Sequence, residues 1–246
     1  MQNLKSSKTV NGGLPQFPAR RNVDHLRLVP GRTPRYKLAI FDFDGTLADS
    51  LAWFLGVLNE VADDYNFRRL KEQELAELRS LEARQILEYV GISRWKLPLL
   101  QRHVRKRMTS EIRHIALFPG IAGLLQRLRY EGIALAIVTS NSLLNVREVL
   151  GRQNACLIQH YACGAPILGK RPRLRKVLHS SGVHASEAIF IGDEIRDLHA
   201  ARAEGIAFGA VSWGVNSVES LTERFPEEMF CSIDEIAERV VRPWVG

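Results

Sequence analysis

Short runs of apolar residues recur along the chain, and each stops at a polar or glycine-containing segment. The runs cover residues 38–41, 133–138, 188–191 and 206–211, and apolar residues at helical spacing lie between them. A continuous apolar run that ends at turn residues is typical of a strand buried on both faces. Strands that alternate with helices predict an α/β fold with a Rossmann-like parallel sheet, in which ligands bind beyond the carboxyl ends of the strands.

One long stretch breaks this alternation. Residues 50–117 contain no convincing strand pattern, and their apolar positions recur at the spacing of amphipathic helices. We therefore predict a small all-helical cap over 50–117, inserted after the first strand of an α/β core formed by 36–49 and 118–246. Trp53 and Trp95 lie in apolar helical contexts, so both are expected in the interior of the cap.

The charge of the chain is unevenly distributed. The 246 residues carry a net charge of +7, but residues 1–35 alone hold seven basic residues against one acid. The rest of the chain has 27 basic and 26 acidic residues and is nearly neutral. The basic excess therefore belongs to an N-terminal tail that also contains glycine and proline and is predicted to be disordered. This distribution disfavours a nucleic-acid partner for the folded body.

Composition also bears on location. No apolar run approaches the roughly 20 residues that a membrane span requires, and the start of the chain lacks the apolar segment of a secretory signal. The three cysteines form no CxxC pair, as expected for thiols in a reducing compartment. We predict a cytoplasmic protein without a membrane partner, present as a monomer or a homodimer.

Polar motifs that carry chemistry follow the predicted strands. They are Asp42-x-Asp44-Gly45-Thr46, Thr139-Ser140, Gly169-Lys170 and Gly192-Asp193-x-x-x-Asp197. In this order and strand context, the set resembles the motifs of the haloacid dehalogenase superfamily of phosphotransferases, within its phosphoglycolate-phosphatase-like group. The resemblance covers the chain from about residue 35 to the end.

The resemblance implies a Mg²⁺-dependent phosphomonoester hydrolase that forms an aspartyl phosphate on Asp42. A phosphate dianion repels carboxylates, so Asp42 can approach phosphorus only when cations neutralise both groups. Asp44 would donate a proton to the leaving oxygen and later accept one from the hydrolytic water.

The metal ligands are also implied by the resemblance. They are the Asp42 side chain, the backbone carbonyl of Asp44 and the Asp193 side chain, all hard oxygen donors suited to Mg²⁺. Asp197 would hold the catalytic lysine or a metal-bound water. Glu194 departs from the small hydroxyl residue that often follows the first acid of this motif, and it either alters the metal preference or faces solvent.

Phosphate binding is assigned by the same resemblance to Thr139, Ser140 and Lys170. Simpler interpretations stay open for several positions. Lys170 begins a basic cluster that a solvated helix face would also explain, and Thr139 would also suit an ordinary strand end. Asp193 and Asp197 would also be favourable near a helix N-terminus without binding any metal.

Other functions of the same fold are compatible with part of the pattern. Dehalogenases lack an acid two residues after the nucleophile because a halide leaving group needs no proton, so Asp44 favours phosphate chemistry. A phosphomutase would share all four motifs, and a non-catalytic module that binds a phospholigand or nucleic acid is the other alternative.

The substrate is expected to be a small phosphorylated metabolite, with phosphoglycolate as the candidate that the resemblance suggests. Arg79 and Arg84 lie where similar phosphatases carry a specificity loop in the cap, and a guanidinium suits a carboxylate. The alternative is that both arginines are exposed helix charges that pair with Glu77 and Glu88.

Overall fold

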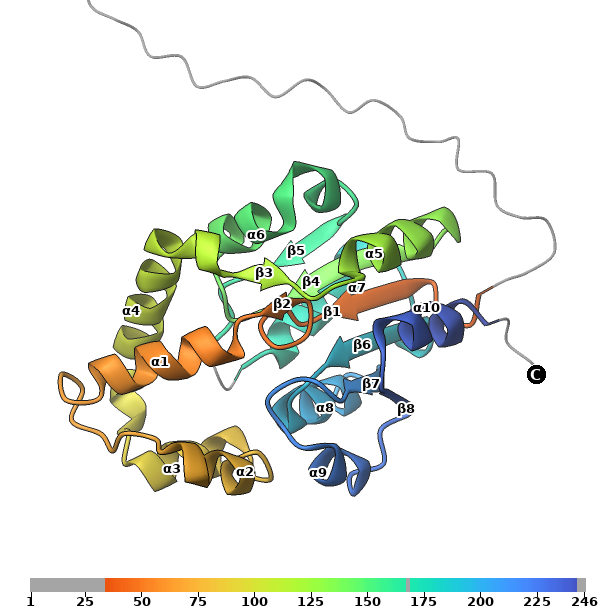
Figure 1. Cartoon of the computed structure of the whole chain (residues 1–246). Helices are drawn as coiled ribbons and strands as arrows, with labels where there is room; N and C mark the ends of the chain where they lie inside the picture. Colours follow the sequence, from red (N-terminus) through yellow and green to blue (C-terminus); the bar gives the residue numbers. More distant parts are fainter. Residues whose placement is uncertain (1–33, 167–168, 243–246) are drawn as a thin grey trace, which may run out of the picture.

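The computed structural model of this chain describes residues 34–166 and 169–242. Within these residues, parallel strands form a six-stranded sheet in the order β5-β4-β1-β6-β7-β8 (Figure 1). The strands are β1 (Leu38–Phe41), β4 (Ala134–Val138), β5 (His160–Ala162), β6 (Ala188–Gly192), β7 (Ala207–Val211) and β8 (Glu228–Phe230). The predicted α/β fold with a parallel sheet is confirmed. The predicted tail over 1–35 lies outside the described residues except for its last two positions.

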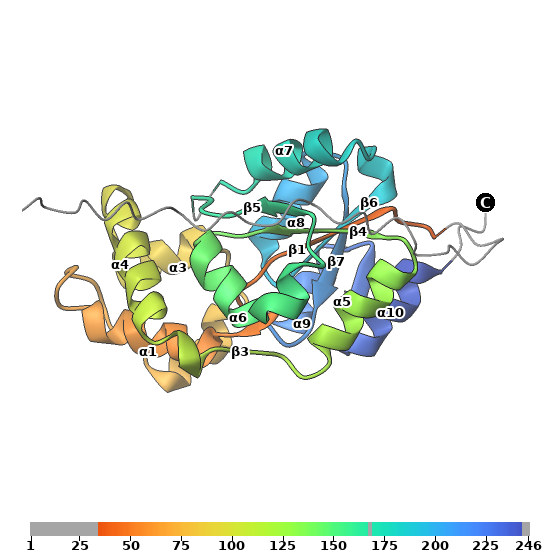
Figure 2. The ribbon, with the colours of Figure 1, turned by 90° about the horizontal axis from the view of Figure 1, so that it is seen from above.

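Successive side chains of the central strands enter two apolar layers, one on each face of the sheet. On β1, Ala39 and Phe41 enter one layer, and Leu38 and Ile40 enter the other. Figure 2 shows helices on both faces. The helices are α5 (Ile121–Tyr130), α6 (Leu143–Ala155) and α10 (Ile233–Val241) on the first face, α7 (Arg171–Ser181) and α8 (Ile195–Arg202) on the second, and α9 (Val218–Thr222) after β7. Burial on both faces explains why the central strands appear in the sequence as continuous apolar runs.

The cap lies beside the carboxyl end of β1 and is built from helices (Figure 1). They are α1 (Leu51–Val61), α2 (Leu75–Leu78), α3 (Ala83–Val90) and α4 (Leu97–Ser110), with single 3₁₀ turns at Glu72–Glu74, Arg94–Lys96 and Ile112–His114. Two short antiparallel strands, β2 (Ala48–Asp49) and β3 (Ala116–Leu117), join the cap to the core.

Two details of the sequence prediction are wrong. The strand β3 falls inside the stretch that was expected to contain none, because a strand of two residues carries no readable alternation. Trp95 is 70% exposed rather than interior, since it lies in the 3₁₀ turn between α3 and α4 and not on the inner face of a helix. Trp53 is partly buried, as expected, and its indole N–H donates to Glu111.

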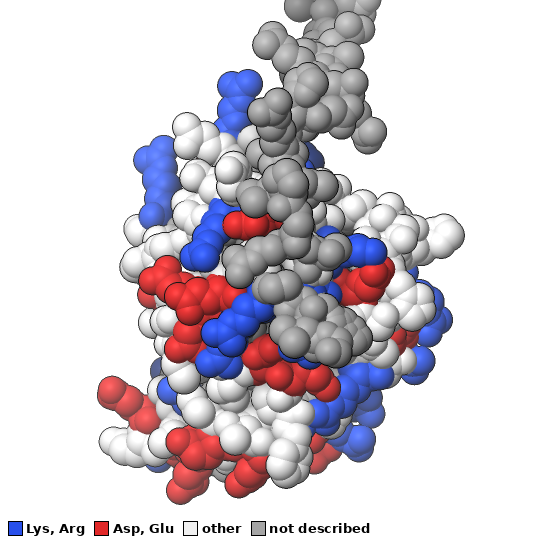
Figure 3. Space-filling model, turned by 90° about the vertical axis from the view of Figure 1, so that its right-hand side faces the viewer, with Lys and Arg blue, Asp and Glu red and all other residues white. Residues whose placement is uncertain are grey.

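The folded body has a surface of mixed charge, and none of its described helices is suited to cross a membrane. The face in Figure 3 carries acidic and basic side chains interspersed. Among the described residues, no helix combines the length and the apolar character that crossing a bilayer requires.

Candidate active site

The turn after β1 brings the first motif to the carboxyl edge of the sheet. Asp42 follows the last residue of β1 and is 3% exposed, and its Oδ1 accepts a hydrogen bond from the N–H of Phe43 at 2.7 Å. Gly45 has φ of +76°, and a Cβ on it would lie 2.4 Å from Oδ2 of Asp193. Glycine is therefore required here both for the backbone conformation and for the close approach of a carboxylate.

Lys170 lies between two buried carboxylates. It precedes α7 and is 4% exposed, and its Nζ is 2.6 Å from Oδ2 of Asp42 and 2.8 Å from Oδ1 of Asp197. Burial alone would lower the pKa of the ammonium, but the carboxylates of Asp197 and Asp42 raise the pKa above its ordinary value. Lys170 is therefore a fixed positive charge and not part of a solvated face.

Asp193 is held in one orientation from three sides. Its Oδ1 accepts from the hydroxyl of Thr46 at 2.8 Å, and its Oδ2 accepts from the N–H of Val215 at 2.8 Å. A Cβ on Gly214 would lie 2.0 Å from Cβ of Asp193, so the chain packs directly against it. Burial, with the nearby charge of Asp42, raises the pKa of Asp193 to about 7.

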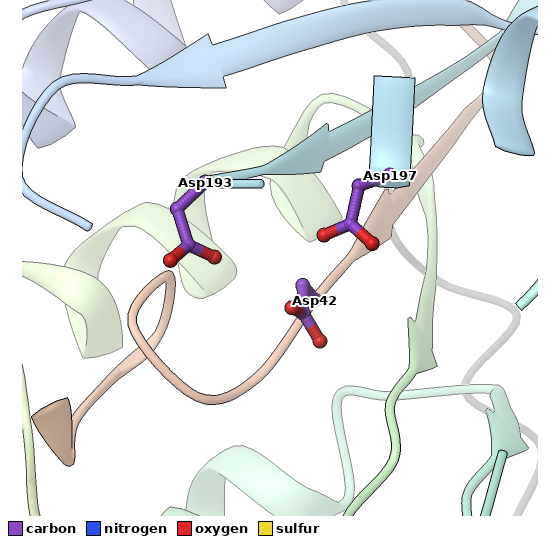
Figure 4. Close-up of side chains that lie close together, drawn as sticks. All are labelled: Asp42, Asp193 and Asp197. Atoms are coloured by element: carbon purple, nitrogen blue, oxygen red, sulfur yellow. The ribbon is translucent and has the colours of Figure 1, made fainter. Parts of the chain in front are cut away.

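Three carboxylates converge at this point. Figure 4 shows the side chains of Asp42, Asp193 and Asp197 turned toward a common space, from the ends of β1 and β6 and from α8. One oxygen of each lies within 4.8 Å of the others, and all three residues are buried. Three buried carboxylates with a single ammonium leave excess negative charge, so the cluster fits a cation that prefers oxygen ligands.

Asp44 lies outside this cluster and is bound by other partners. Its carboxylate accepts hydrogen bonds from the Ser50 hydroxyl at 3.0 Å and from Nδ2 of Asn141 at 3.1 and 3.2 Å. Burial, with the charge of Asp42, raises the pKa of Asp44 to about 6. A carboxyl group with this pKa can donate a proton near neutral pH, which an ordinary aspartate cannot.

Thr139 and Ser140 follow β4 at the same edge of the sheet. Thr139 is fully buried, and its hydroxyl accepts the N–H of Asn141 at 3.0 Å. Ser140 lines the cavity next to Asp44. Both residues therefore lie at the carboxyl edge of the sheet, as the sequence predicted, and their role in phosphate binding stays a prediction.

A cavity of about 210 Å³ lies between the cap and these residues. Most of its lining is apolar and comes from α1, α3 and α4, whereas Asp44, Asn141 and Ser140 line its core side. The cap contributes Gln101 and Arg105, spaced one helical turn apart on α4. The cavity is therefore suited to hold the part of a substrate that lies beyond the reacting group.

The predicted specificity residues are placed differently from each other. Arg79 donates from its guanidinium to the backbone carbonyls of Gly214 and Val215 in the core, at 2.9 and 3.1 Å. Arg84 is exposed on α3 and pairs with Glu88 at 3.1 Å. Neither arginine is among the residues that line the cavity.

Glu194 does not face open solvent. Its side chain is 14% exposed, it pairs with Arg196, and both residues line the cavity. The pair adds a carboxylate and a guanidinium next to the acidic cluster. Glu194 is thus charge-compensated within the site.

A comparison with known families shows which family this chain belongs to. The model of the haloacid dehalogenase-like hydrolases matches residues 39–211. The chain belongs to this family. The family that the sequence motifs suggested is confirmed. The match spans the turn of Asp42, the strand end at Thr139 and the acidic cluster.

Individual members of the haloacid dehalogenase-like family show the extent of the similarity. The phosphoglycolate phosphatase of Synechococcus elongatus is 34% identical over 204 residues, which cover 82% of this chain and 96% of the relative. The phosphoglycolate phosphatase of Agrobacterium fabrum is 28% identical over 201 residues, covering 75% of this chain and 84% of the relative.

Solved structures share the fold. A predicted phosphatase from Clostridium acetobutylicum aligns with a TM-score of 0.71 at 20% identity, over 83% of this chain and 98% of that one. CbbY from Rhodobacter sphaeroides, in complex with phosphate, aligns with a TM-score of 0.65 at 22% identity, over 82% and 96%. At these identities the two structures support the fold of this chain and nothing finer.

The structure adds contacts that the sequence analysis did not assign to any residue, including one for Thr46, which stands in the first motif. Ser50 and Asn141 bind Asp44, and Thr46 binds Asp193. Gln101 and Arg105 were overlooked as well, although their i, i+4 spacing puts both on one face of α4 and could have drawn attention. Thr46 already stands in the Asp42 motif, and for Ser50 the closeness to that motif was the available signal.

Proposed function

We propose that this chain is a Mg²⁺-dependent phosphomonoester hydrolase that forms an aspartyl phosphate on Asp42, with phosphoglycolate as its substrate. The observation that carries the proposal is the position of the Asp42 carboxylate, 2.6 Å from the buried ammonium of Lys170 at the end of β1. The curated relatives that match most of the chain bear the name phosphoglycolate phosphatase, which supports the substrate and the reaction.

The acidic cluster would hold the metal. Asp42 and Asp193 would each contribute a carboxylate oxygen to Mg²⁺, and Asp44 a backbone carbonyl, as the family pattern implies. Asp197 would serve by holding Lys170, which it contacts at 2.8 Å. When bound, Mg²⁺ supplies positive charge that offsets the repulsion between the carboxylates and a phosphate dianion.

Different residues of the chain would perform different steps of the reaction. An oxygen of Asp42 attacks phosphorus, and the bond from phosphorus to the leaving oxygen breaks. Asp44, with its raised pKa, protonates the leaving oxygen and then accepts the proton of the water that attacks the aspartyl phosphate. Lys170 stabilises the charge on the phosphoryl oxygens, and Thr139 and Ser140 help to position them.

The leaving group would lie in the cavity under the cap. Arg105 is the cation that the cap contributes to the lining of this cavity. Its guanidinium already donates to the carbonyls of Ser140 and Ala165, at 2.6 and 3.2 Å, so it is held in place. We propose Arg105, rather than Arg79 or Arg84, as the contact for the carboxylate of the substrate.

The test is turnover by the full chain against a panel of phosphate monoesters, with Mg²⁺ and with a chelator. We expect release of inorganic phosphate equal to the alcohol formed, loss of turnover in the chelator, and the highest kcat/KM for 2-phosphoglycolate. Ethyl phosphate, which has the same carbon count without the carboxylate, is the matched control substrate.

Trapping the intermediate tests the role of Asp42. Reduction with borohydride during turnover should convert residue 42 to homoserine, which mass spectrometry detects. Phosphate transfer to a second acceptor without net release would indicate a phosphomutase instead. Binding of phosphate esters without any turnover would indicate the non-catalytic alternative.

A further inference from the structure

Arg79 connects the cap to the core loop over residues 212–217, which we call the β7 loop. Its Nε donates to the carbonyl of Val215 at 3.1 Å and its Nη2 to that of Gly214 at 2.9 Å. In return, the carbonyl of Arg79 accepts from Nδ2 of Asn216 at 2.8 Å. Both ends of Arg79, side chain and backbone, therefore bind the same short segment.

The β7 loop in turn holds Asp193. The N–H of Val215 donates to Oδ2 of Asp193 at 2.8 Å, and the N–H of Asn216 donates to the Asp193 carbonyl at 3.2 Å. Gly214 packs so closely that a Cβ would lie 2.0 Å from Cβ of Asp193. A shift of the loop would therefore move the hydrogen bond that orients this carboxylate.

We propose that Arg79 is a positioning residue for the cation site, acting from the cap through the β7 loop on Asp193. The inference rests on the proposed function, because it requires a divalent cation at Asp193. A peptide N–H that orients a ligating carboxylate affects metal affinity through the geometry of the ligand. Because coupling between two equilibria is reciprocal, a cation at Asp193 would also favour contact between the cap and the core.

The sign of the effect separates this role from a plain charge effect. Loss of the positive charge of Arg79 should strengthen the binding of a cation nearby, because the Coulomb repulsion between the two positive charges is removed. Loss of the hydrogen bonds from Arg79 to the β7 loop should weaken the binding of the cation. A weakened affinity in a variant without the guanidinium is therefore evidence for positioning.

Arg105 offers a matched control within the same chain. It also reaches from the cap to the core, with Nε on the carbonyl of Ser140 and Nη2 on that of Ala165. These carbonyls belong to the loops after β4 and β5 and not to the β7 loop. Replacing Arg105 removes a cap contact of the same kind without touching the segment that orients Asp193.

The experiment is a calorimetric titration of the full chain with Mn²⁺, and with Mg²⁺, at pH 7.5 without substrate. Arg79→Met should weaken cation binding by about 10- to 100-fold, the range seen when a partner of a metal ligand is lost. Arg79→Lys keeps the charge and one donor, so it should recover part of the affinity. Arg105→Met, titrated here without substrate, removes a positive charge but leaves the β7 loop in place, so it should not weaken cation binding.

A second substitution covers the case in which Arg79→Met does not fold. Asn216→Ala removes the bonds that Nδ2 donates to the carbonyls of Arg79 and Leu81, together with the bond that Oδ1 accepts from the N–H of Ile195. It should weaken cation binding in the same direction. When both variants fold, the double variant should lose less affinity than the sum of the single losses, because both act through one loop.

Two results would overturn the inference. Unchanged cation affinity in Arg79→Met, with a raised KM for phosphoglycolate and an unchanged KM for ethyl phosphate, would show that Arg79 recognises a carboxylate. Equal weakening in Arg105→Met would show a general effect of cap contacts. If the unmodified chain bound no cation, the proposed metal dependence would fail, and this inference with it.

Discussion

The core and the cap differ in how closely their side chains pack. Phe41 and Phe190 in the core are fully buried, as are nearly all apolar residues of the central strands. In the cap, the described buried cluster is small, and it consists of Val61, Val90, Ile92, Leu97 and Leu100. The cavity of about 210 Å³ between cap and core is lined mostly by cap side chains, and Trp95 and Leu99 are 70% and 54% exposed.

This difference separates two tasks. Asp42, Lys170 and Asp193 stand on strand ends and loops of a densely packed frame, where distances of 2.6 to 2.8 Å can be kept constant. The cap surrounds the cavity with a looser apolar shell that meets the core through backbone carbonyls. Substitutions at the strand ends of the core should therefore affect the chemical step, and substitutions of the cap residues that line the cavity should affect the fit of the substrate.

The largest expected effect is that of Asp42→Asn. Loss of the nucleophile should lower kcat on the order of 10⁶-fold, as removal of the nucleophile does in a serine hydrolase. The fold should persist, because Lys170 keeps its contact with Asp197. Asp63→Asn, an exposed acid of the cap that pairs with Arg69, is the matched control and should keep full activity. Turnover by the Asp42 variant within tenfold of normal would disprove the assignment.

The contrast in packing can be measured by truncating one leucine in each region. Leu128 on α5 is fully buried in the core, and Leu100 on α4 is 3% exposed and lines the cavity. Leu128→Ala should lower the free energy of unfolding by about 4 kcal/mol and Leu100→Ala by about 2 to 3 kcal/mol, since fewer contacts are lost beside an existing cavity. Urea unfolding measures both. Equal losses would contradict the view that the cap is loosely packed.

The smallest expected effect concerns pH. The pKa of Asp193 is raised to about 7 in the folded protein, so without metal its stabilising contribution is present below the ordinary pKa and lost as the pH rises through 7. A cation binds the ionised form, so Mg²⁺ affinity should fall about tenfold between pH 8 and pH 6. Calorimetry at both values, with the Mg²⁺-induced rise in Tm as a second readout, checks this. An affinity that stays constant over the range would show that the pKa of Asp193 is not raised to this extent.

Much of the core could be predicted from the sequence, because apolar runs and the motifs that follow them are local features of the chain. The apolar run at 38–41 and its abrupt end at Asp42 predicted both a buried strand and the position of the nucleophile candidate. The Gly192-Asp193 motif placed a second carboxylate at the neighbouring strand end. Parallel strands expose their carboxyl ends at one edge, so residues far apart in sequence could be expected together.

The sequence analysis did not predict two of the shortest strands, β3 and β8. The strand β3 has two residues and β8 has three, too few for a period of two to stand out from chance. Trp95 was misplaced because an apolar context resembles a helix interior even where the chain forms a 3₁₀ turn.

Only the tertiary structure decided how the cap meets the core. Arg79 binds carbonyls of Gly214 and Val215, more than 130 positions away, and Arg105 binds carbonyls at Ser140 and Ala165. Every residue has a backbone carbonyl, so the residue type does not show which carbonyl will accept a hydrogen bond. The sequence by itself determined which elements form and where their polar ends lie, because periodicity is local; the partners of the cap arginines depended on the packing of whole domains.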